Sequence, residues 1–160
     1  MHPKEQKQKL VSKAILDVIE KDGLSGLTHT KVSRRSGVSR AWIYEYIGKE
    51  KTVLVKFAAS AFAEHYSRLN LEFPKNKEEL QRQLQEGVHF LFDRTEQEPV
   101  AIKLYFRYRG SQNPIGEVIK KYEKQWIQGA AECLQKIFEL SPESARLMAE
   151  TVLTLRLGFA

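Results

Sequence analysis

The feature that most constrains this chain is a stretch in which two short helices must be joined by a tight turn. Residues 28–47 read THTKVSRRSGVSRAWIYEYI. The side chain of Thr28 can cap the free N–H groups of a first helix. Gly37 tolerates the positive φ that ends this helix, and the hydroxyl of Ser39 can cap a second helix only a few residues later. The stretch therefore predicts a helix-turn-helix.

The two faces of the second predicted helix differ in character. Ile43 and Ile47 lie four positions apart, so they share one face, and we expect them to pack against Val32 and Val38. The opposite face carries Arg40, Trp42, Tyr44, Glu45 and Tyr46. A solvated helix seldom displays so many aromatic rings, whereas a helix in a DNA major groove can use them against sugars, phosphates and thymine methyl groups. This face indicates DNA binding.

Several residues of this stretch match a known pattern: Thr28, Val32-Ser33, Gly37-Val38-Ser39, Ile43-Tyr44 and Ile47. Over these positions, roughly the first third of the chain, it resembles the TetR family of transcriptional regulators. Glu50 stands where that family usually has a phosphate-binding Lys, and the flanking Lys49 and Lys51 can take over that contact. From the outward face and the resemblance, the predicted DNA contacts are Thr28, Thr30, Lys31, Arg40, Ala41, Trp42, Tyr44, Glu45, Tyr46, Lys49 and Lys51.

The distribution of charge agrees with a DNA-binding first segment. The chain has 26 Lys and Arg against 20 Asp and Glu, a formal net charge of +6 at pH 7. Residues 1–52 hold 11 basic and 6 acidic side chains, a net charge of +5, while residues 53–160 hold 15 and 14, a net charge of +1. The excess of positive charge therefore lies on the segment that is expected to meet a polyanion.

The cysteine count, the absence of metal-ligand spacings and the length of the apolar runs exclude several classes of protein. Cys133 is the only cysteine, so an internal disulfide is excluded, and no CxxC or Cys/His spacing suggests a metal site. The sequence has no Gly-rich phosphate loop, no HExxH and no Gly-x-Ser-x-Gly, and it has no apolar run long enough to span a membrane. We predict a cytoplasmic protein that is not an enzyme, needs no cofactor and has no membrane partner.

Helical periodicity continues through the rest of the chain. Apolar residues recur every three or four positions, and Pro, Gly, Ser and Asn fall between the periodic segments. The additional predicted helices cover about residues 4–21, 51–71, 77–93, 99–109, 115–140 and 142–159. We predict an all-α protein, with a helix-turn-helix DNA-binding domain at residues 1–50 and a helical ligand-binding and dimerisation domain at residues 51–160.

Aromatic side chains gather on four of the later helices. Rings with polar tips on converging helices can line an apolar cavity, but they can equally fill a core. The resemblance favours a cavity, because TetR-like proteins generally bind a small inducer between these helices. The predicted ligand contacts, for an apolar or aromatic effector, are Phe62, Tyr66, His89, Phe90, Tyr105, Tyr108, Tyr122 and Trp126.

The last predicted helix has more apolar positions than one core-facing stripe requires. We therefore predict a homodimer whose interface includes Met148, Val152 and Leu155. TetR-like proteins normally use two C-terminal helices for dimerisation, and only one is found here before Ala160. Either the sequence lacks a final helix, or the protein dimerises through an unusual arrangement of its last two helices.

The combined prediction is a ligand-responsive regulator, a repressor that binds a palindromic double-stranded DNA operator as a homodimer. Two alternatives stay open. One is a DNA-binding protein without an effector, whose C-terminal bundle only dimerises. The other is a small all-α enzyme that uses Cys133 or His89.

Overall fold

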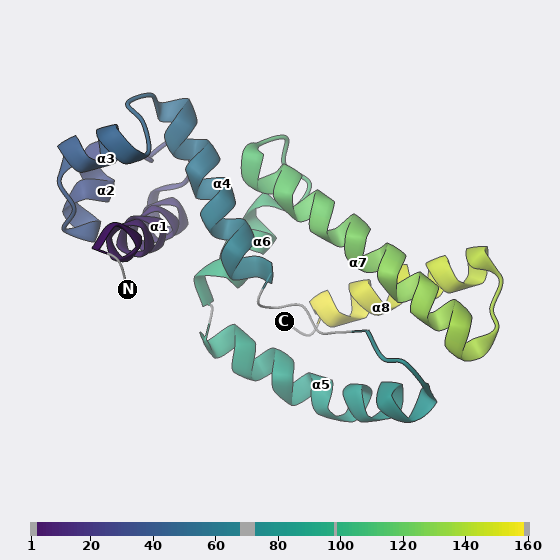
Figure 1. Ribbon diagram of the computed structural model, residues 1–160. Helices are drawn as coiled ribbons and strands as arrows, with labels where there is room; N and C mark the ends of the chain where they lie inside the picture. Colours follow the sequence, from purple (N-terminus) through teal and green to yellow (C-terminus); the bar gives the residue numbers. More distant parts are fainter. Residues whose placement is uncertain (1–2, 68–72, 98, 159–160) are drawn as a thin grey trace. The chain divides into compact units, whose positions relative to one another are not determined.

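The computed structural model describes residues 3–67, 73–97 and 99–158, and throughout these ranges the regular structure is α-helical, as predicted. Figure 1 shows the helices in chain order. Their bounds are α1 Pro3–Asp22, α2 His29–Ser36, α3 Arg40–Tyr46, α4 Lys51–Ser67, α5 Lys77–Gln97, α6 Pro99–Tyr108, α7 Pro114–Phe138 and α8 Pro142–Gly158. Among these residues no helix is both long and apolar enough to cross a membrane.

The predicted capping residues hold the ends of the short helices. Thr28 Oγ1 accepts the backbone N–H of Lys31 at 3.3 Å, and Ser39 Oγ accepts that of Trp42 at 3.3 Å. Gly37 adopts φ +70°, a left-handed conformation that costs glycine little, and closes α2. Helices α2 and α3 are therefore separated by only three residues, which confirms the predicted helix-turn-helix.

The headpiece, defined here as α1, α2 and α3, encloses an apolar core. Helix α1 packs against α2 and α4, and α2 packs against α3. Val32, Val38 and Ile43 are buried as predicted, while Ile47 is half-buried at the C-terminal cap of α3. The remaining buried side chains of α1, the following turn and the start of α4 are Val11, Ala14, Ile15, Leu16, Val18, Ile19, Leu27 and Leu54.

The chain divides into two compact units. The first unit comprises residues 1–68 and 100–119, so it contains the headpiece, α4, α6 and the first residues of α7. The second unit comprises residues 69–99 and 120–160, with α5, the rest of α7 and α8. Packing thus groups α4 and α6 with the headpiece. The functional division at residue 50 stays a prediction.

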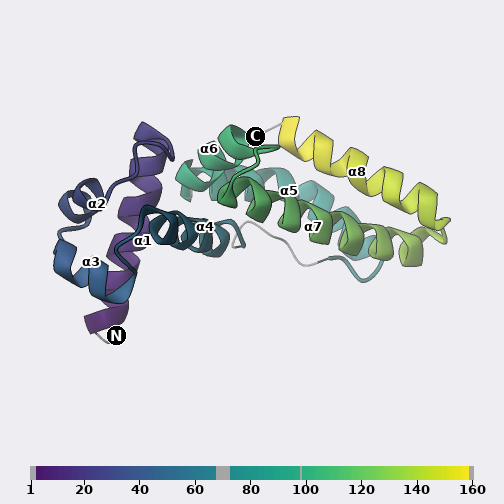
Figure 2. The same ribbon diagram turned by 90° about the horizontal axis from the view of Figure 1, so that it is seen from above.

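The second unit has a small core between α7 and α8, which lie side by side in Figures 1 and 2. Its buried residues among those described are Ala130, Leu134, Ala145 and Ala149. Three of the four are alanines, so the helices can approach closely while burying little apolar area. Leu80, Trp126, Ile127, Ala131 and Leu140 cover this core in part.

A short segment before α5 packs against α7. An added Cβ at Gly129 would lie 2.3 Å from Cε2 of Phe73, so the absence of a side chain there makes room for the ring. Cys133 Sγ lies 3.0 Å from the carbonyl oxygen of Pro74 and donates to it. Burial raises the pKa of the Cys133 thiol. The thiol therefore has a packing role.

Candidate nucleic-acid interface

Helix α3 presents three different strips of side chains. Successive residues of an α-helix are rotated by about 100°. Ile43 is fully buried and Ile47 half-buried, and these two define the inward direction. Ala41 and Glu45, both exposed, lie almost opposite to them. The predicted aromatic contacts flank this outermost strip on its two edges.

One edge carries Trp42 and Tyr46, whose rings lie 4.7 Å apart. The ammonium group of Lys4 lies 4.8 Å from the centre of the Tyr46 ring, and that of Lys7 lies 5.9 Å from the centre of the Trp42 ring. Both are cation–π contacts from the start of α1. The sequence analysis placed Trp42 and Tyr46 on the outward face, whereas in the structure they connect that face to α1.

The other edge carries Tyr44, which the structure fixes through His29. The His29 and Tyr44 rings meet edge to face, with their centres 4.9 Å apart. His29 Nε2 lies 2.9 Å from the carbonyl oxygen of Gly48. A carbonyl can only accept, so Nε2 carries the proton and donates. His29 thereby connects the start of α2 to the end of α3, a role that the sequence analysis missed.

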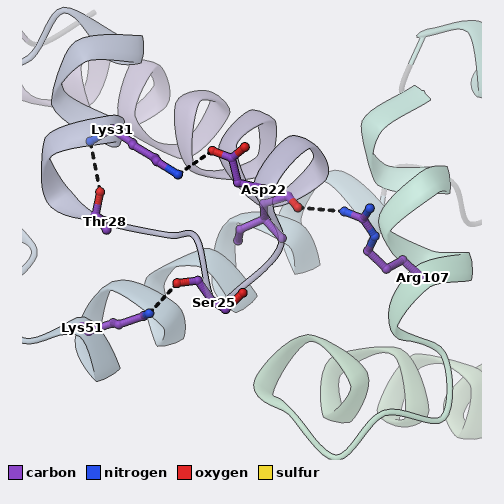
Figure 3. A network of polar contacts seen from close by, with 7 residues as sticks. Asp22, Ser25, Thr28, Lys31, Lys51 and Arg107 are labelled. Carbon is purple, nitrogen blue, oxygen red and sulfur yellow. Dashed lines mark hydrogen bonds and ion pairs between the residues drawn. The ribbon is translucent and has the colours of Figure 1, made fainter.

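The turn between α1 and α2 is surrounded by polar contacts (Figure 3). Lys31 Nζ forms an ion pair with Asp22 at 2.8 Å, and this hydrogen bond lowers the pKa of Asp22. Lys51 Nζ, at the start of α4, donates to the carbonyl oxygen of Ser25 at 2.8 Å. Two of the lysines predicted to contact DNA therefore have partners within the protein, and a DNA contact by either would compete with these bonds.

Arg40 and Lys49 differ from those two lysines. Both side chains are exposed, and neither makes a hydrogen bond or an ion pair within the described part of the chain. They lie at the start of α3 and just after its end. Two exposed cations thus bracket α3, which is the arrangement that backbone phosphates on either side of a groove would neutralise. The predicted Thr28 and Thr30 are exposed around the start of α2.

Helix α6 holds the C-terminal end of α1. Arg107 Nη1 donates to the carbonyl oxygens of Ile19 at 3.0 Å and Glu20 at 2.5 Å. Lys103 pairs with the Glu20 carboxylate at 2.9 Å, and this hydrogen bond lowers the pKa of Glu20. Because carbonyl groups at a helix C-terminus carry partial negative charge, the Arg107 guanidinium stabilises that end of α1. The sequence analysis did not predict this contact.

The predicted ligand contacts fall in both units. In the first unit, Phe62, Tyr105 and Tyr108 are buried, and the hydroxyl of Tyr108 accepts the backbone N–H of Leu24 at 3.1 Å. In the second unit, Tyr122 and Trp126 are half-buried. The side chains of Tyr66, His89 and Phe90 lie outside the described residues. The predicted effector cavity stays a prediction.

The predicted dimer contacts lie on α8. Met148 is 45% exposed and Leu155 56% exposed, and Val152 is half-buried. Leu147, which the sequence analysis did not include, is 66% exposed. These large apolar side chains on one helix form a surface that a second copy of the chain could cover.

Comparison with known proteins identifies a shared fold. No family model matches the chain, and no curated protein matches it significantly. Among solved structures, a transcriptional regulator from Rhodococcus sp. Rha1 matches with a TM-score of 0.64 and 19% sequence identity, over 99% of this chain and 81% of that one. The chain therefore shares the fold of this transcriptional regulator over nearly its whole length, at low sequence identity.

Proposed function

We propose that this protein is a TetR-like transcriptional repressor that binds a palindromic DNA operator through α3. The observation that carries the proposal is the arrangement of buried and exposed residues on and beside α3. Its buried residue Ile43 fixes it in the headpiece, and its exposed side is bracketed by Arg40 and Lys49, which have no partner among the described residues. The excess positive charge of residues 1–52 and the fold shared with a transcriptional regulator support the same conclusion.

The proposal includes a homodimer. Two recognition helices enter successive major grooves only when they lie about one turn of DNA, roughly 34–36 Å, apart. The exposed apolar side chains of α8 supply a surface for association, with Met148, Val152 and Leu155 in the interface. A palindromic operator follows from the twofold symmetry of such a dimer.

The proposal also includes release by a small apolar or aromatic effector. An effector can displace the protein from DNA only if it binds a state with separated headpieces more tightly than the DNA-competent state. The contacts of Arg107 and Lys103 with the end of α1 support this step, because a displacement of α6 would act directly on the headpiece.

Selection from a library of random duplexes tests the central claim. We expect enrichment of a palindrome with a half-site separation of one helical turn. Arg40→Ala should reduce binding to the selected site more than binding to random DNA, because Arg40 is exposed at the first residue of the helix that is proposed to read the groove. Lys49→Ala, the matched cation beyond the helix, should reduce both equally and lower the salt slope by about one unit. Failure to enrich any sequence would contradict the proposal.

A second function, DNA binding without an effector, is favoured by the burial of Phe62 and Tyr105 and by the bond from Leu24 to Tyr108. Side chains with such partners can serve packing alone. Fluorescence of Trp126 in a Trp42→Phe background separates the two functions. Under the effector proposal, an apolar ligand quenches Trp126 and releases the operator. A ligand that stabilises the protein thermally without affecting operator binding favours the second function.

A further inference from the structure

The outermost strip of α3 contains only one small residue and one acid. Ala41 and Glu45 lie four positions apart, both are exposed, and both lie nearly opposite the buried Ile43. Trp42 contacts Lys7 on one edge of α3, and Tyr44 contacts His29 on the other edge. Any partner that meets α3 along its outward direction therefore meets Ala41 and Glu45 first.

An acid at this position is unfavourable for general affinity toward DNA. Phosphates repel a carboxylate. Two other acids of the headpiece, Asp17 and Asp22, are paired with Arg35 and Lys31, respectively. In contrast, no ion pair neutralises Glu45 within the described residues. Its charge thus costs binding energy on every DNA sequence unless some base compensates for it.

One base edge in the major groove can compensate a carboxylate. The exocyclic N4 amino group of cytosine is a donor there, and Glu or Asp accepts from it, whereas guanine presents two acceptors that repel a carboxylate. Adjacent to this contact, the methyl group of Ala41 suits the C5-methyl group of thymine. Both contacts require that the side chains of Ala41 and Glu45 lie directly over the base edges in the major groove.

Glu45 also acts on its neighbour Tyr46. The Glu45 carboxylate, as a hydrogen-bond acceptor for the Tyr46 hydroxyl and through its negative charge, raises the pKa of Tyr46. Tyr46 is in turn held by Lys4. A carboxylate has about four acceptor positions, so its influence on Tyr46 leaves Glu45 with capacity for a base.

We propose that Glu45 is a specificity-determining residue that accepts a hydrogen bond from cytosine N4 at one position of each half-site. Ala41 contacts the methyl group of a neighbouring thymine. The inference rests on the proposed DNA-binding function and assigns the class of base that α3 selects. Glu45 contributes discrimination and reduces general affinity.

The test is selection from random duplexes followed by binding to the selected site and its single-base variants. The wild-type protein should require cytosine at one symmetric pair of positions, with about tenfold weaker binding for other bases. Glu45→Gln should shift the preference at that pair alone to adenine, because Gln pairs with adenine N6 and N7. Glu45→Ala should lose the preference and bind random DNA more tightly than the wild type.

Glu50→Gln provides the matched control. Glu50 is also an exposed acid, but it precedes α4 and lies off α3, so its substitution should tighten binding to all sequences without changing the selected bases. Equal effects of Glu45→Gln and Glu50→Gln on every sequence would overturn the inference, as would an unchanged consensus for Glu45→Gln. Absence of any consensus for the wild type would instead contradict the proposed function.

Discussion

The two units of this chain use their helices in different ways. In the first unit, large branched and aromatic side chains such as Ile15, Ile43, Phe62 and Tyr105 are almost completely buried. In the second unit, the described core is mostly alanine, and Leu147, Met148 and Leu155 are exposed. The first unit therefore obtains stability from its own interior, whereas the second leaves apolar area for another surface to cover.

Polar contacts show the same contrast. The described cross-helix ion pairs of the first unit join Lys31 to Asp22, Arg35 to Asp17 and Lys103 to Glu20. The ion pairs described in the second unit instead lie within single helices and join Arg82 to Glu79 and Arg146 to Glu150. A unit whose helices are joined by such contacts suits the proposed DNA recognition, which depends on fixed spacing of side chains, while a unit with an uncovered apolar surface suits association.

The largest expected effect is loss of a core side chain from the first unit. Ile15→Ala should lower the free energy of unfolding by about 2–5 kcal/mol, since it removes buried methylene groups and leaves a cavity. Leu147→Ala, the exposed counterpart in the second unit, should change it by less than about 0.5 kcal/mol. Chemical denaturation measures both. A comparable loss for the two variants would invalidate the contrast between the units.

The next effect concerns association through α8. Met148→Arg should weaken the proposed dimer by about tenfold or more, because a charge would have to be buried at an apolar contact. Sedimentation at micromolar concentrations measures the dissociation constant. Arg146→Met serves as a control, because Arg146 already pairs with Glu150 on the same helix. A wild-type protein that stays monomeric would show that the apolar face of α8 serves another partner.

Gly129 provides a test of packing in the second unit. Gly129→Ala should cost about 1–3 kcal/mol, because the added methyl group would overlap the Phe73 ring. In a Phe73→Ala background the same change should be neutral or stabilising by up to about 1 kcal/mol, since alanine favours helix over glycine. A double-mutant cycle in thermal unfolding gives the coupling. Additive changes would show that the segment before α5 does not pack there in solution.

Gly37 tests the turn of the helix-turn-helix in the first unit. Gly37→Ala should cost about 1–2 kcal/mol, because a left-handed backbone at φ +70° is unfavourable for a residue with a Cβ. No other atom lies within 4 Å of the added Cβ, so the cost is conformational alone. Gly37→Asn should cost less than Gly37→Ala, since asparagine tolerates this region. Equal costs would point to a steric cause.

The smallest effect is the pH dependence of the Glu20–Lys103 pair. The pKa of Glu20 is lowered in the folded state, so the pair contributes stability above the unfolded pKa, and this contribution is lost as the pH falls through the folded pKa. Glu20→Gln should remove this part of the acid dependence while leaving neutral stability almost unchanged, because the pair is exposed. Unfolding measured between pH 7 and pH 3 compares the two proteins.

The local structure of the chain was largely predictable from sequence because local rules determine it. Thr28, Ser39, Asn76 and Ser141 cap helices as their side chains allow. Helical periodicity located the eight helices of the described residues, with ends displaced by a few residues. For example, α5 continues to Gln97 rather than residue 93, and α7 ends at Phe138 rather than residue 140. The last turn of a helix is often frayed, so its end is harder to predict from sequence than a capped first turn.

The site was less predictable, because its decisive contacts join distant parts of the chain. Periodicity identified the outward face of α3, but it could not show that Lys4 contacts Tyr46 and Lys7 contacts Trp42. Likewise, no local signal links Lys51 to Ser25 or Arg107 to Ile19. Such contacts depend on tertiary packing of helices, which a hydrophobic pattern specifies only by face.

The contacts of α6 with α1 also set an order of events during synthesis. Arg107 reaches a carbonyl 88 positions earlier in the chain, and Tyr108 reaches a backbone N–H 84 positions earlier. At about 5–20 residues per second, a ribosome needs roughly 4–18 s to make that interval. The caps and core of the headpiece can form during this time, but the end of α1 waits for its last partners until α6 emerges. A nascent chain thus carries a formed helix-turn-helix on a first unit that is still incomplete.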